Sequence, residues 1–201
     1  MEVNKIICGD SIMVTASLFH REEGGSIPTS PHQLVLMEID KSLAKECYKK
    51  WHYLGVKDFV SSYNFGVFYG NRLWGCITFK PPSAEETIKG LFGSEDQRGH
   101  FEIGRFALSD SLPKNSESRV ISIAIRLIRK SEKIKSIITY ADTAFGHGGT
   151  IYRATGFQYK GLTKQKSDFW VNGKIKERGR TKGLGGEWKP RSRKHLFVKI
   201  F

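Results

Sequence analysis

Disulfide-forming cysteines, long apolar runs and acidic residues are all scarce in this chain of 201 residues. The three cysteines, Cys8, Cys47 and Cys76, are widely spaced and form neither a CxxC pair nor a zinc-binding pattern. A small, odd number of cysteines favours a reduced protein over a disulfide-stabilised one. No apolar run approaches the ~20 residues that span a bilayer. The N-terminal segment, with Glu2 and Asp10, is unlike a signal peptide. We therefore expect a cytoplasmic protein with no membrane partner.

The scarcity of acidic residues is concentrated in the last quarter of the chain. The whole chain has 33 Lys and Arg against 20 Asp and Glu, a net charge of +13. Residues 153–201 hold 14 basic and 3 acidic residues, a net +11, whereas residues 1–152 carry only +2. Apolar residues make up 39% of the chain, which is enough for a packed core. These numbers predict a folded domain whose C-terminal part binds an anionic partner, nucleic acid before membrane.

The pattern of apolar residues predicts a mixed α/β sheet flanked by helices. Asp40 and Ser116 are suited to cap helices, and residues 70–72 to make the tight turn of a hairpin. Residues 4–14 fit a strand or hairpin, and residues 83–100 a loop or a short helical insertion. We expect strands at 33–39, 63–69, 73–79, 101–108, 137–141, 157–160 and 196–200, and helices at 41–53, 119–133 and 150–155.

Several spaced motifs resemble a known superfamily. Tyr152-Arg-Ala-Thr-Gly156-Phe157 follows a buried strand, which is similar to the last helix of GNAT-type acyltransferases and the strand after it. Between about residues 51 and 157 the chain also resembles the phage Mom proteins. The motifs that carry this resemblance are His52-Tyr53, the hairpin at 65–79, Glu102-Ile-Gly-Arg105-Phe, Ser122, Tyr140-Ala-Asp142 and Ile151-Tyr152.

The resemblance implies a GNAT-like mixed central β-sheet flanked by helices, with a basic C-terminal extension. It implies one domain, with a core at about 34–160 and a DNA-contacting part at about 161–201. It further implies a transferase that places a carbamoylmethyl (acetamido) group on the exocyclic amine of adenine in double-stranded DNA and so protects phage DNA from restriction. That amine is a poor nucleophile because its lone pair is delocalised. The reaction needs an activated donor, a positioned base and an adenine rotated out of the duplex.

The donor implied by the resemblance is an acyl or glycinamide-type group. GNAT enzymes hold the pyrophosphate of acetyl-CoA with a glycine-rich loop before their central helix. The corresponding residues 109–120 (SDSLPKNSESRV) contain no glycine, so acetyl-CoA is a possible donor that would lack its usual pyrophosphate loop. The amides of residues 115–118, with Lys114 and Arg119, are the alternative phosphate-binding groups. The family's association with iron makes His52 and Asp142, with His147, candidate ligands.

Four residues are candidates for catalysis. A neutral imidazole accepts a proton near neutral pH, so His52 is the candidate base, with Tyr53 to orient either His52 or the substrate. The alternative for His52 is a helix-terminal histidine that interacts with the helix dipole. Asp142 ends a buried strand, where it accepts a proton, holds a ligand or receives the amine hydrogens of adenine. The alternative for Asp142 is a cap for the turn that follows. Tyr152 lies either near the departing group or in the core.

Three further residues are candidates for binding substrate or donor. Arg105 lies in an otherwise apolar strand and either meets an anionic partner or is a solvated charge. Ser122 contacts substrate or donor, or simply packs within its helix. His147 lies in the glycine-rich segment 142–149, which suits a phosphate or a flipped nucleotide.

The basic tail interleaves Lys and Arg with aromatic residues, a pattern that suits phosphates and bases, although a solvated basic face is the alternative. Residues 179–186 are expected to form a flexible basic loop. The candidate DNA-binding residues are Lys164, Lys166, Trp170, Arg178, Arg180, Lys182, Arg191, Arg193 and Lys194. Two rival functions remain: a GNAT N-acetyltransferase acting on a protein or small-molecule amine, and a non-catalytic DNA-binding GNAT-like module.

Overall fold

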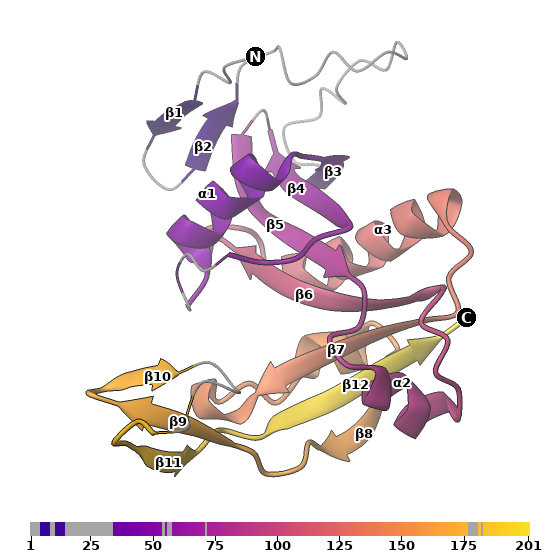
Figure 1. Cartoon of the computed structure of the whole chain (residues 1–201). Coiled ribbons are helices and arrows are strands. Elements are labelled where there is room, and N and C mark those ends of the chain that lie inside the picture. The colour runs from indigo at the N-terminus through magenta and orange to yellow at the C-terminus, as the bar shows by residue number, and fades with distance from the viewer. Residues whose placement is uncertain are drawn as a thin grey trace. The chain divides into compact units, whose positions relative to one another are not determined.

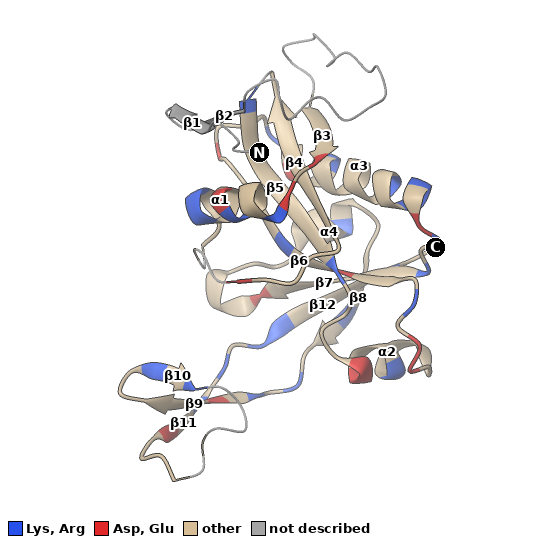
Figure 2. Ribbon diagram, turned by 45° about the horizontal axis from the view of Figure 1, so that its top comes forward, with Lys and Arg blue, Asp and Glu red and all other residues tan. Residues whose placement is uncertain are grey.

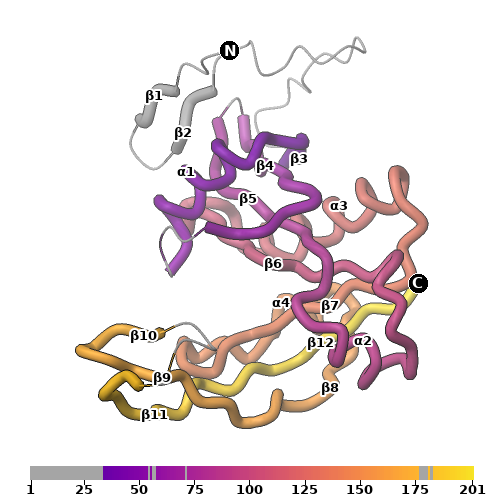
Figure 3. The backbone as a smooth tube through the Cα atoms, in the orientation of Figure 1, coloured from indigo at the N-terminus to yellow at the C-terminus, as the bar shows by residue number. Residues whose placement is uncertain are grey.

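Two units make up the computed structural model shown in Figure 1, which describes residues 5–8, 11–14, 34–53, 55, 58–70, 72–176, 181 and 183–201. The first unit contains the described part of residues 1–138 together with 200–201, and the second contains residues 139–199. Strand β7 (Ser136–Asp142) begins in the first unit and ends in the second, and Figure 3 traces the backbone through it. The expected single domain with a basic part from about 161 stays a prediction.

The first unit is built on a mainly antiparallel sheet. Its strands are β1 (Lys5–Cys8), β2 (Ser11–Val14), β3 (Leu34–Glu38), β4 (Tyr63–Tyr69), β5 (Arg72–Lys80) and β6 (His100–Leu108). β4 pairs with β3 and β5, and β5 pairs with β2 and β6, all of them antiparallel. β6 then pairs in parallel with the first residues of β7. The mixed sheet and the strands expected within this unit are confirmed, and residues 4–14 supply the hairpin β1–β2.

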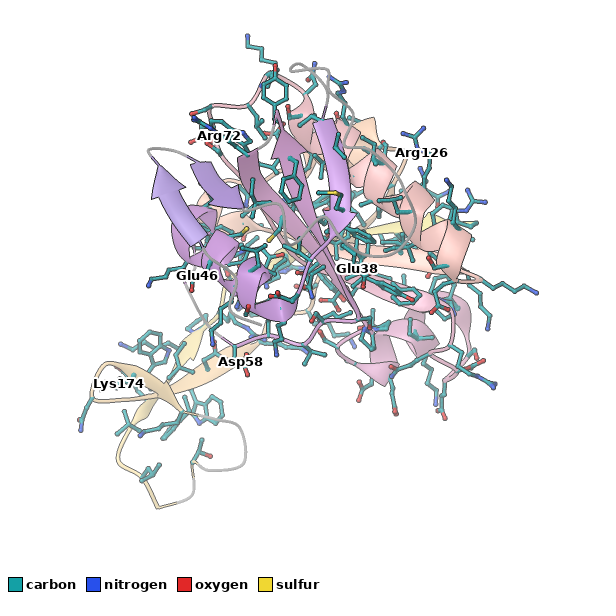
Figure 4. All side chains as sticks on the ribbon, turned by 90° about the horizontal axis from the view of Figure 1, so that it is seen from above. Glu38, Glu46, Asp58, Arg72, Arg126 and Lys174 are labelled. Atoms are coloured by element: carbon teal, nitrogen blue, oxygen red, sulfur yellow. The ribbon has the colours of Figure 1, made fainter. Side chains whose placement is uncertain are left out.

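Helices α1 (Lys41–Trp51) and α3 (Ser116–Ser131) lie on opposite faces of this sheet (Figures 1 and 4). Asp40 caps α1 as expected, because its Oδ1 accepts a hydrogen bond of 2.7 Å from the amide of Leu43. The buried side of α1 packs on β4, β5 and β6. A short helix, α2 (Glu85–Phe92), occupies part of the expected insertion. Among the described residues, no helix is long and apolar enough to cross a membrane.

The expected cap of α3 is wrong by one residue. Asn115, in the left-handed conformation with φ 66°, precedes the helix and makes no side-chain capping bond. Ser116 is the first helical residue, and its buried hydroxyl donates to the carbonyl of Pro113 at 2.6 Å. Ser116 therefore joins the helix to the preceding loop instead of capping it.

The second unit contains the end of β7, α4 (Thr150–Ala154), β8 (Gln158–Leu162) and β12 (Lys194–Ile200). β12 lies between β7 and β8 and is antiparallel to β8. Gly149 precedes α4 with φ 72°, and a Cβ there would lie 2.3 Å from the ring of Phe197. Only glycine fits this position, because both its backbone conformation and the packed ring exclude a side chain.

A separate three-stranded sheet follows in the basic tail, with the order β10 (Lys174–Lys176), β9 (Ser167–Val171), β11 (Glu187–Pro190). No strands were expected between residues 161 and 195. The turn between β9 and β10 is formed by Asn172 and Gly173, both with positive φ, a strong signal for a hairpin. Of the expected flexible loop at 179–186, residues 179, 180 and 182 lie outside the described residues. The described remainder carries neither helix nor strand.

Candidate active site

The candidate base His52 lies at the C-terminal end of α1. Its amide donates to the carbonyl of Tyr48 at 3.0 Å, and its own carbonyl accepts from the amide of Gly55 at 2.8 Å. Gly55 has φ 58°, which lets the chain turn sharply after the helix. The half-buried imidazole stacks on the ring of Tyr53 at 4.5 Å and meets the edge of the Tyr48 ring at 5.6 Å. Backbone and aromatic contacts together fix where this imidazole lies.

Tyr48 connects the helix to the sheet beneath it. Its hydroxyl lies 2.6 Å from Oγ1 of Thr78 on β5 and 3.1 Å from the carbonyl oxygen of Arg105 on β6. Thr78 in turn donates to Oδ1 of Asn64 on β4 at 2.8 Å. Burial raises the pKa of Tyr48 well above its ordinary value, so the phenol stays neutral and keeps its proton for these bonds.

Arg105 lies against the same aromatic rings. Its guanidinium carbon is 5.6 Å from the ring centre of Tyr48 and 5.4 Å from that of Phe59, within the range of cation–π attraction. Its Nη1 donates to the carbonyl of Gly55 at 3.3 Å. Arg105 therefore contacts the turn that begins at His52. The structure brings His52 and Arg105 together at the Tyr48 ring, and Tyr53 stacks on His52.

Asp58 and Phe59 extend this cluster along the chain after the turn. The carboxylate of Asp58, labelled in Figure 4, lies 3.3 Å from the ammonium of Lys41. This pairing lowers the pKa of Asp58, mainly through the hydrogen bond from Lys41. The same ammonium lies 5.3 Å from the centre of the Phe59 ring. Residues at both ends of α1 thus hold the segment that packs on Arg105.

Glu102 makes an ion pair of its own on β6. One of its oxygens lies 3.0 Å from the ammonium of Lys80, and the other accepts from the amide and the hydroxyl of Ser83, both at 3.0 Å. The Arg105 side chain uses aromatic rings and a carbonyl instead of this carboxylate.

The residues predicted to bind phosphate lie at the start of α3. Lys114 and Arg119 are exposed, and the hydroxyl of Ser122 donates to the carbonyl of Ser118 at 2.9 Å within the helix. The amide of Ser116 already donates to Pro113, and the acidic Glu117 lies in the first turn. An amide that is already bonded and a carboxylate make this loop a poor cradle for a pyrophosphate. The described residues therefore do not fit acetyl-CoA in the manner of a glycine-rich loop.

Asp142, His147 and Tyr152 belong to the second unit. Oδ1 of Asp142 accepts from the amide of Ala144 at 3.0 Å and caps the 3₁₀ turn Thr143–Phe145, which is its structural alternative. Its Oδ2 lies 3.9 Å from the ammonium of Lys194. Tyr152 is buried and its ring packs at 5.5 Å from that of Phe197, while His147 is exposed.

An iron site does not fit the part of the chain that the structure describes. No group of three or more His, Cys, Asp or Glu side chains there is placed to hold a metal ion. Between Asp142 and His147 the recorded bond joins backbone atoms, from the His147 amide to the Asp142 carbonyl at 3.4 Å. Gly146 ends the 3₁₀ turn with φ 68°, and Gly149 accommodates Phe197, so the fold explains two of the glycines in this segment.

Some of the predicted DNA-binding residues make hydrogen bonds or ion pairs within the protein, whereas others are exposed. Figure 2 shows basic residues on β10 and β12. Arg193 donates to the carbonyl of Thr163 at 2.8 Å, and Arg191 lies 3.8 Å from Asp168. Trp170 is half-buried, whereas Lys164 and Lys166 are exposed. Lys194 lies 3.9 Å from Oδ2 of Asp142. The other three candidates, Arg178, Arg180 and Lys182, lie outside the described residues.

Sequence reasoning missed Tyr48, Thr78, Asn64 and Phe59. Tyr48 lies on the apolar side of α1, and a tyrosine on such a side needs a hydrogen-bond partner when it is buried. That requirement was the available signal, but the partners lie 30 and 57 residues away in the chain and could not be identified from local spacing.

The sequence of this chain is similar to that of known proteins over most of its length. Residues 33–196 match the model of the Mom protein family. The chain is 31% identical over 169 residues to the methylcarbamoylase mom of Escherichia phage Mu, a match that covers 83% of this chain and 64% of that protein. The matched part thus spans less than two thirds of the relative's length.

Solved structures share the fold at low sequence identity. An acetyltransferase from Bacillus subtilis in complex with CoA is 14% identical, with 84% of this chain and 98% of that chain covered and a TM-score of 0.52. NAA60 of Arabidopsis thaliana in complex with a bisubstrate analogue is 11% identical, with the same coverage and a TM-score of 0.56. A GNAT-family acetyltransferase from Bacillus anthracis is 14% identical, covering 86% and 97%, with a TM-score of 0.51. The expected GNAT-like fold is confirmed.

Proposed function

Because this chain belongs to the Mom protein family, we propose that it is a transferase that places a carbamoylmethyl group on the exocyclic amine of adenine in DNA. The observation that carries the proposal is the half-buried imidazole of His52, held between Tyr48 and Tyr53 inside the matched region. Arg105, on the same Tyr48 ring, adds a cation to this cluster. Base and cation are the two groups that such a transfer asks of the protein.

The chemistry exchanges one bond for another at the adenine nitrogen. Its lone pair forms a bond to the methylene carbon of the donor, and the donor's leaving group departs with the electrons of the broken bond. The nitrogen then loses one proton, and neutral imidazole at His52 accepts it. Arg105 binds the anionic leaving group or a phosphate of the substrate. Tyr53, stacked on His52, keeps the ring oriented for this transfer.

Residues of the second unit retain their predicted roles in this proposal. Asp142 accepts hydrogen bonds from the adenine amine through Oδ2, in exchange for its contact of 3.9 Å with Lys194, and Tyr152 assists departure of the leaving group. The basic tail holds double-stranded DNA by its phosphates. Modified adenine then protects the DNA from restriction endonucleases.

The donor is proposed to be an acyl or glycinamide-type compound distinct from acetyl-CoA. The supporting observation is the start of α3, where Ser116 has its amide engaged and Glu117 adds negative charge. Lys114 and Arg119 are exposed there and suit a smaller anionic group.

An N-acetyltransferase acting on a protein or small-molecule amine is the second candidate, favoured by the likeness to acetyltransferase structures. Calorimetric titration of the purified protein with acetyl-CoA separates the two. The proposal predicts no saturable binding, and tight binding with acetylation of free amines in the absence of DNA would favour the acetyltransferase. A non-catalytic DNA-binding module would give salt-sensitive DNA binding with no modified nucleoside.

The direct test expresses the protein in bacteria, digests plasmid DNA to nucleosides and weighs them by mass spectrometry. A deoxyadenosine heavier by one carbamoylmethyl group in place of a hydrogen is expected. His52→Ala should abolish it at equal protein level and equal DNA affinity. His195→Ala is the matched control, because it makes the same chemical change at a histidine whose ring contacts Tyr159, and it should keep the product. Loss of product in the control alone would contradict the assignment of His52.

A further inference from the structure

The three-stranded sheet of the tail has two chemically different faces. Residues that are directly opposite in neighbouring strands project to the same face, and successive residues alternate. The register places Lys176 and Trp188 opposite Phe169, and it places Ile175 and Glu187 opposite Trp170. Ring contacts agree with this assignment, since Phe169 and Trp188 lie 5.2 Å apart. The register therefore assigns each residue of the three strands to one of the two faces of the sheet.

One face is basic and aromatic, and we call it the aromatic-basic face. It carries Lys174 and Lys176 on β10, Phe169 on β9 and Trp188 on β11. Trp188 is 58% exposed, and both lysines are exposed. Lys174 projects outward from the hairpin in Figure 4. Among the described residues of the three strands, none on this face is acidic.

The other face, which we call the mixed face, neutralises its own charge. It carries Asp168, Glu187 and Lys189 beside Trp170. The ammonium of Lys189 lies 2.6 Å from the carboxylate of Glu187 and 5.6 Å from the ring centre of Trp170. Asp168 lies 3.8 Å from Arg191. A polyanion therefore gains little from this face, because its cations already have partners.

We propose that this sheet binds double-stranded DNA through its aromatic-basic face, with Lys174 and Lys176 on phosphates and Trp188 against the sugars and base edges of a groove. The proposal rests on the function proposed above and names the surface that holds the substrate. It moves the aromatic contact from Trp170, which the sequence suggested, to Trp188 on the opposite face.

The dimensions of the sheet suit this contact. Neighbouring strands lie ~4.8 Å apart, so a β-ribbon fits a major groove that is ~12 Å wide. Alternate residues on one strand are ~7 Å apart, which lets Lys174 and Lys176 reach different phosphates. An exposed indole beside them supplies the apolar surface that proteins stack on bases or insert at a groove.

Charge argues against a second copy of the chain as the occupant. Two aromatic-basic faces brought together by a two-fold axis would oppose Lys174 and Lys176 to the same lysines without an acidic partner from the described strands. DNA is the partner whose charge this face complements.

The test measures binding of the full-length protein to a labelled duplex of about 30 base pairs by fluorescence anisotropy, between about 50 and about 200 mM salt. Each lost phosphate contact lowers the slope of log K against log salt by about 0.9, so the double variant Lys174→Ala/Lys176→Ala should lose about 1.8. The affinity ratio of the unchanged protein to the variant then widens about 12-fold on going from about 200 to about 50 mM salt. Trp188→Ala should weaken binding without changing the slope.

Lys176→Ala and Lys189→Ala form the matched pair, because they remove the same charge from opposite faces of one sheet. The first should lower the slope by about 0.9 and the second should leave it unchanged. Equal effects of the two would overturn the proposal while DNA binding by the unchanged protein keeps the proposed function intact.

Other outcomes of these measurements would overturn either the proposed function or the proposed DNA-binding face. Absence of duplex binding by the unchanged protein would overturn the proposed function itself. Conversion of a dimer to a monomer by Trp188→Ala in sedimentation, or binding of phosphatidylglycerol vesicles in place of DNA, would overturn the assignment of this face to DNA.

Discussion

Replacing Tyr48 by Phe removes one buried hydroxyl and leaves the ring in place. That hydroxyl lies between Thr78 and the carbonyl of Arg105, so its loss deprives a buried carbonyl of a donor, whereas Thr78 keeps its bond to Asn64. One net hydrogen bond is worth ~1 kcal/mol and an unsatisfied buried partner costs ~1–3 kcal/mol. We expect the free energy of unfolding to fall by about 1–2 kcal/mol.

Urea unfolding followed by tryptophan fluorescence measures this loss, with an unchanged m-value as the sign that only stability has changed. Tyr63→Phe is the matched control. The hydroxyl of Tyr63 donates to Glu132 at 2.5 Å in an exposed position, a bond that raises the pKa of this phenol to about 12. Removing an exposed hydroxyl should change stability by about 0.5 kcal/mol or less. Equal losses in the two variants would refute the role given to the buried network.

Activity separates the ring of Tyr48 from its hydroxyl. Tyr48→Phe keeps the aromatic contacts to His52 and Arg105 and should retain most of the modified nucleoside per folded molecule. Tyr48→Leu removes both contacts and should lose most of it. If Tyr48→Leu folds and works as well as Tyr48→Phe, the ring does not position the candidate site.

Three further substitutions test the fold around the site. Thr139→Val should raise the free energy of unfolding by ~1 kcal/mol and with it the midpoint of thermal unfolding, because the buried hydroxyl of Thr139 has no hydrogen-bond partner among the described residues. Gly149→Ala should destabilise by at least ~2 kcal/mol, since it combines a left-handed backbone with a clash against Phe197, and an intact urea midpoint would contradict that packing. Burial lowers the pKa of His100, so the unfolded chain binds a proton first and stability falls as pH drops below about 6.5, by at most ~1.4 kcal/mol at one pH unit lower. His100→Gln should reduce this loss between pH values near 7.5 and 5.5, measured by urea unfolding, and an unchanged slope would contradict it.

Local sequence patterns predicted much of the fold because each carried its own physical signal. Asp40 stands where an N-cap is needed before an amphipathic helix, and Gly70 where a hairpin turns with positive φ. The predicted cap at Ser116 was wrong because a serine near the start of a helix can be either its N-cap or its first residue, and the sequence around it is the same in both cases. Only the left-handed Asn115 distinguishes the two, and no residue pattern prescribes that conformation.

The sequence indicated which residues carry the chemistry of the candidate site, but it did not indicate which residues hold them in place. His52, Tyr53 and Arg105 came from a resemblance of spaced motifs. The structure brings His52 and Arg105 to one ring, with Tyr53 stacked on His52. That ring, Tyr48, depends on Thr78, a partner distant in the sequence and found only once the sheet is folded. The tail sheet was missed for another reason: its strands are three to five residues long, too short for apolar alternation to stand out.

The elemental content of the modified base shows whether this chain adds a carbamoylmethyl group to adenine. Cells that express the protein are grown with nitrogen-15 or ordinary nitrogen, and deoxyadenosine from their DNA is compared by high-resolution mass spectrometry. We expect an added group that contains one nitrogen atom, that is carried on the exocyclic amine and that is absent with His52→Ala. An added group without nitrogen, as in acetylation, or unmodified deoxyadenosine alone from well-expressed protein, would contradict it.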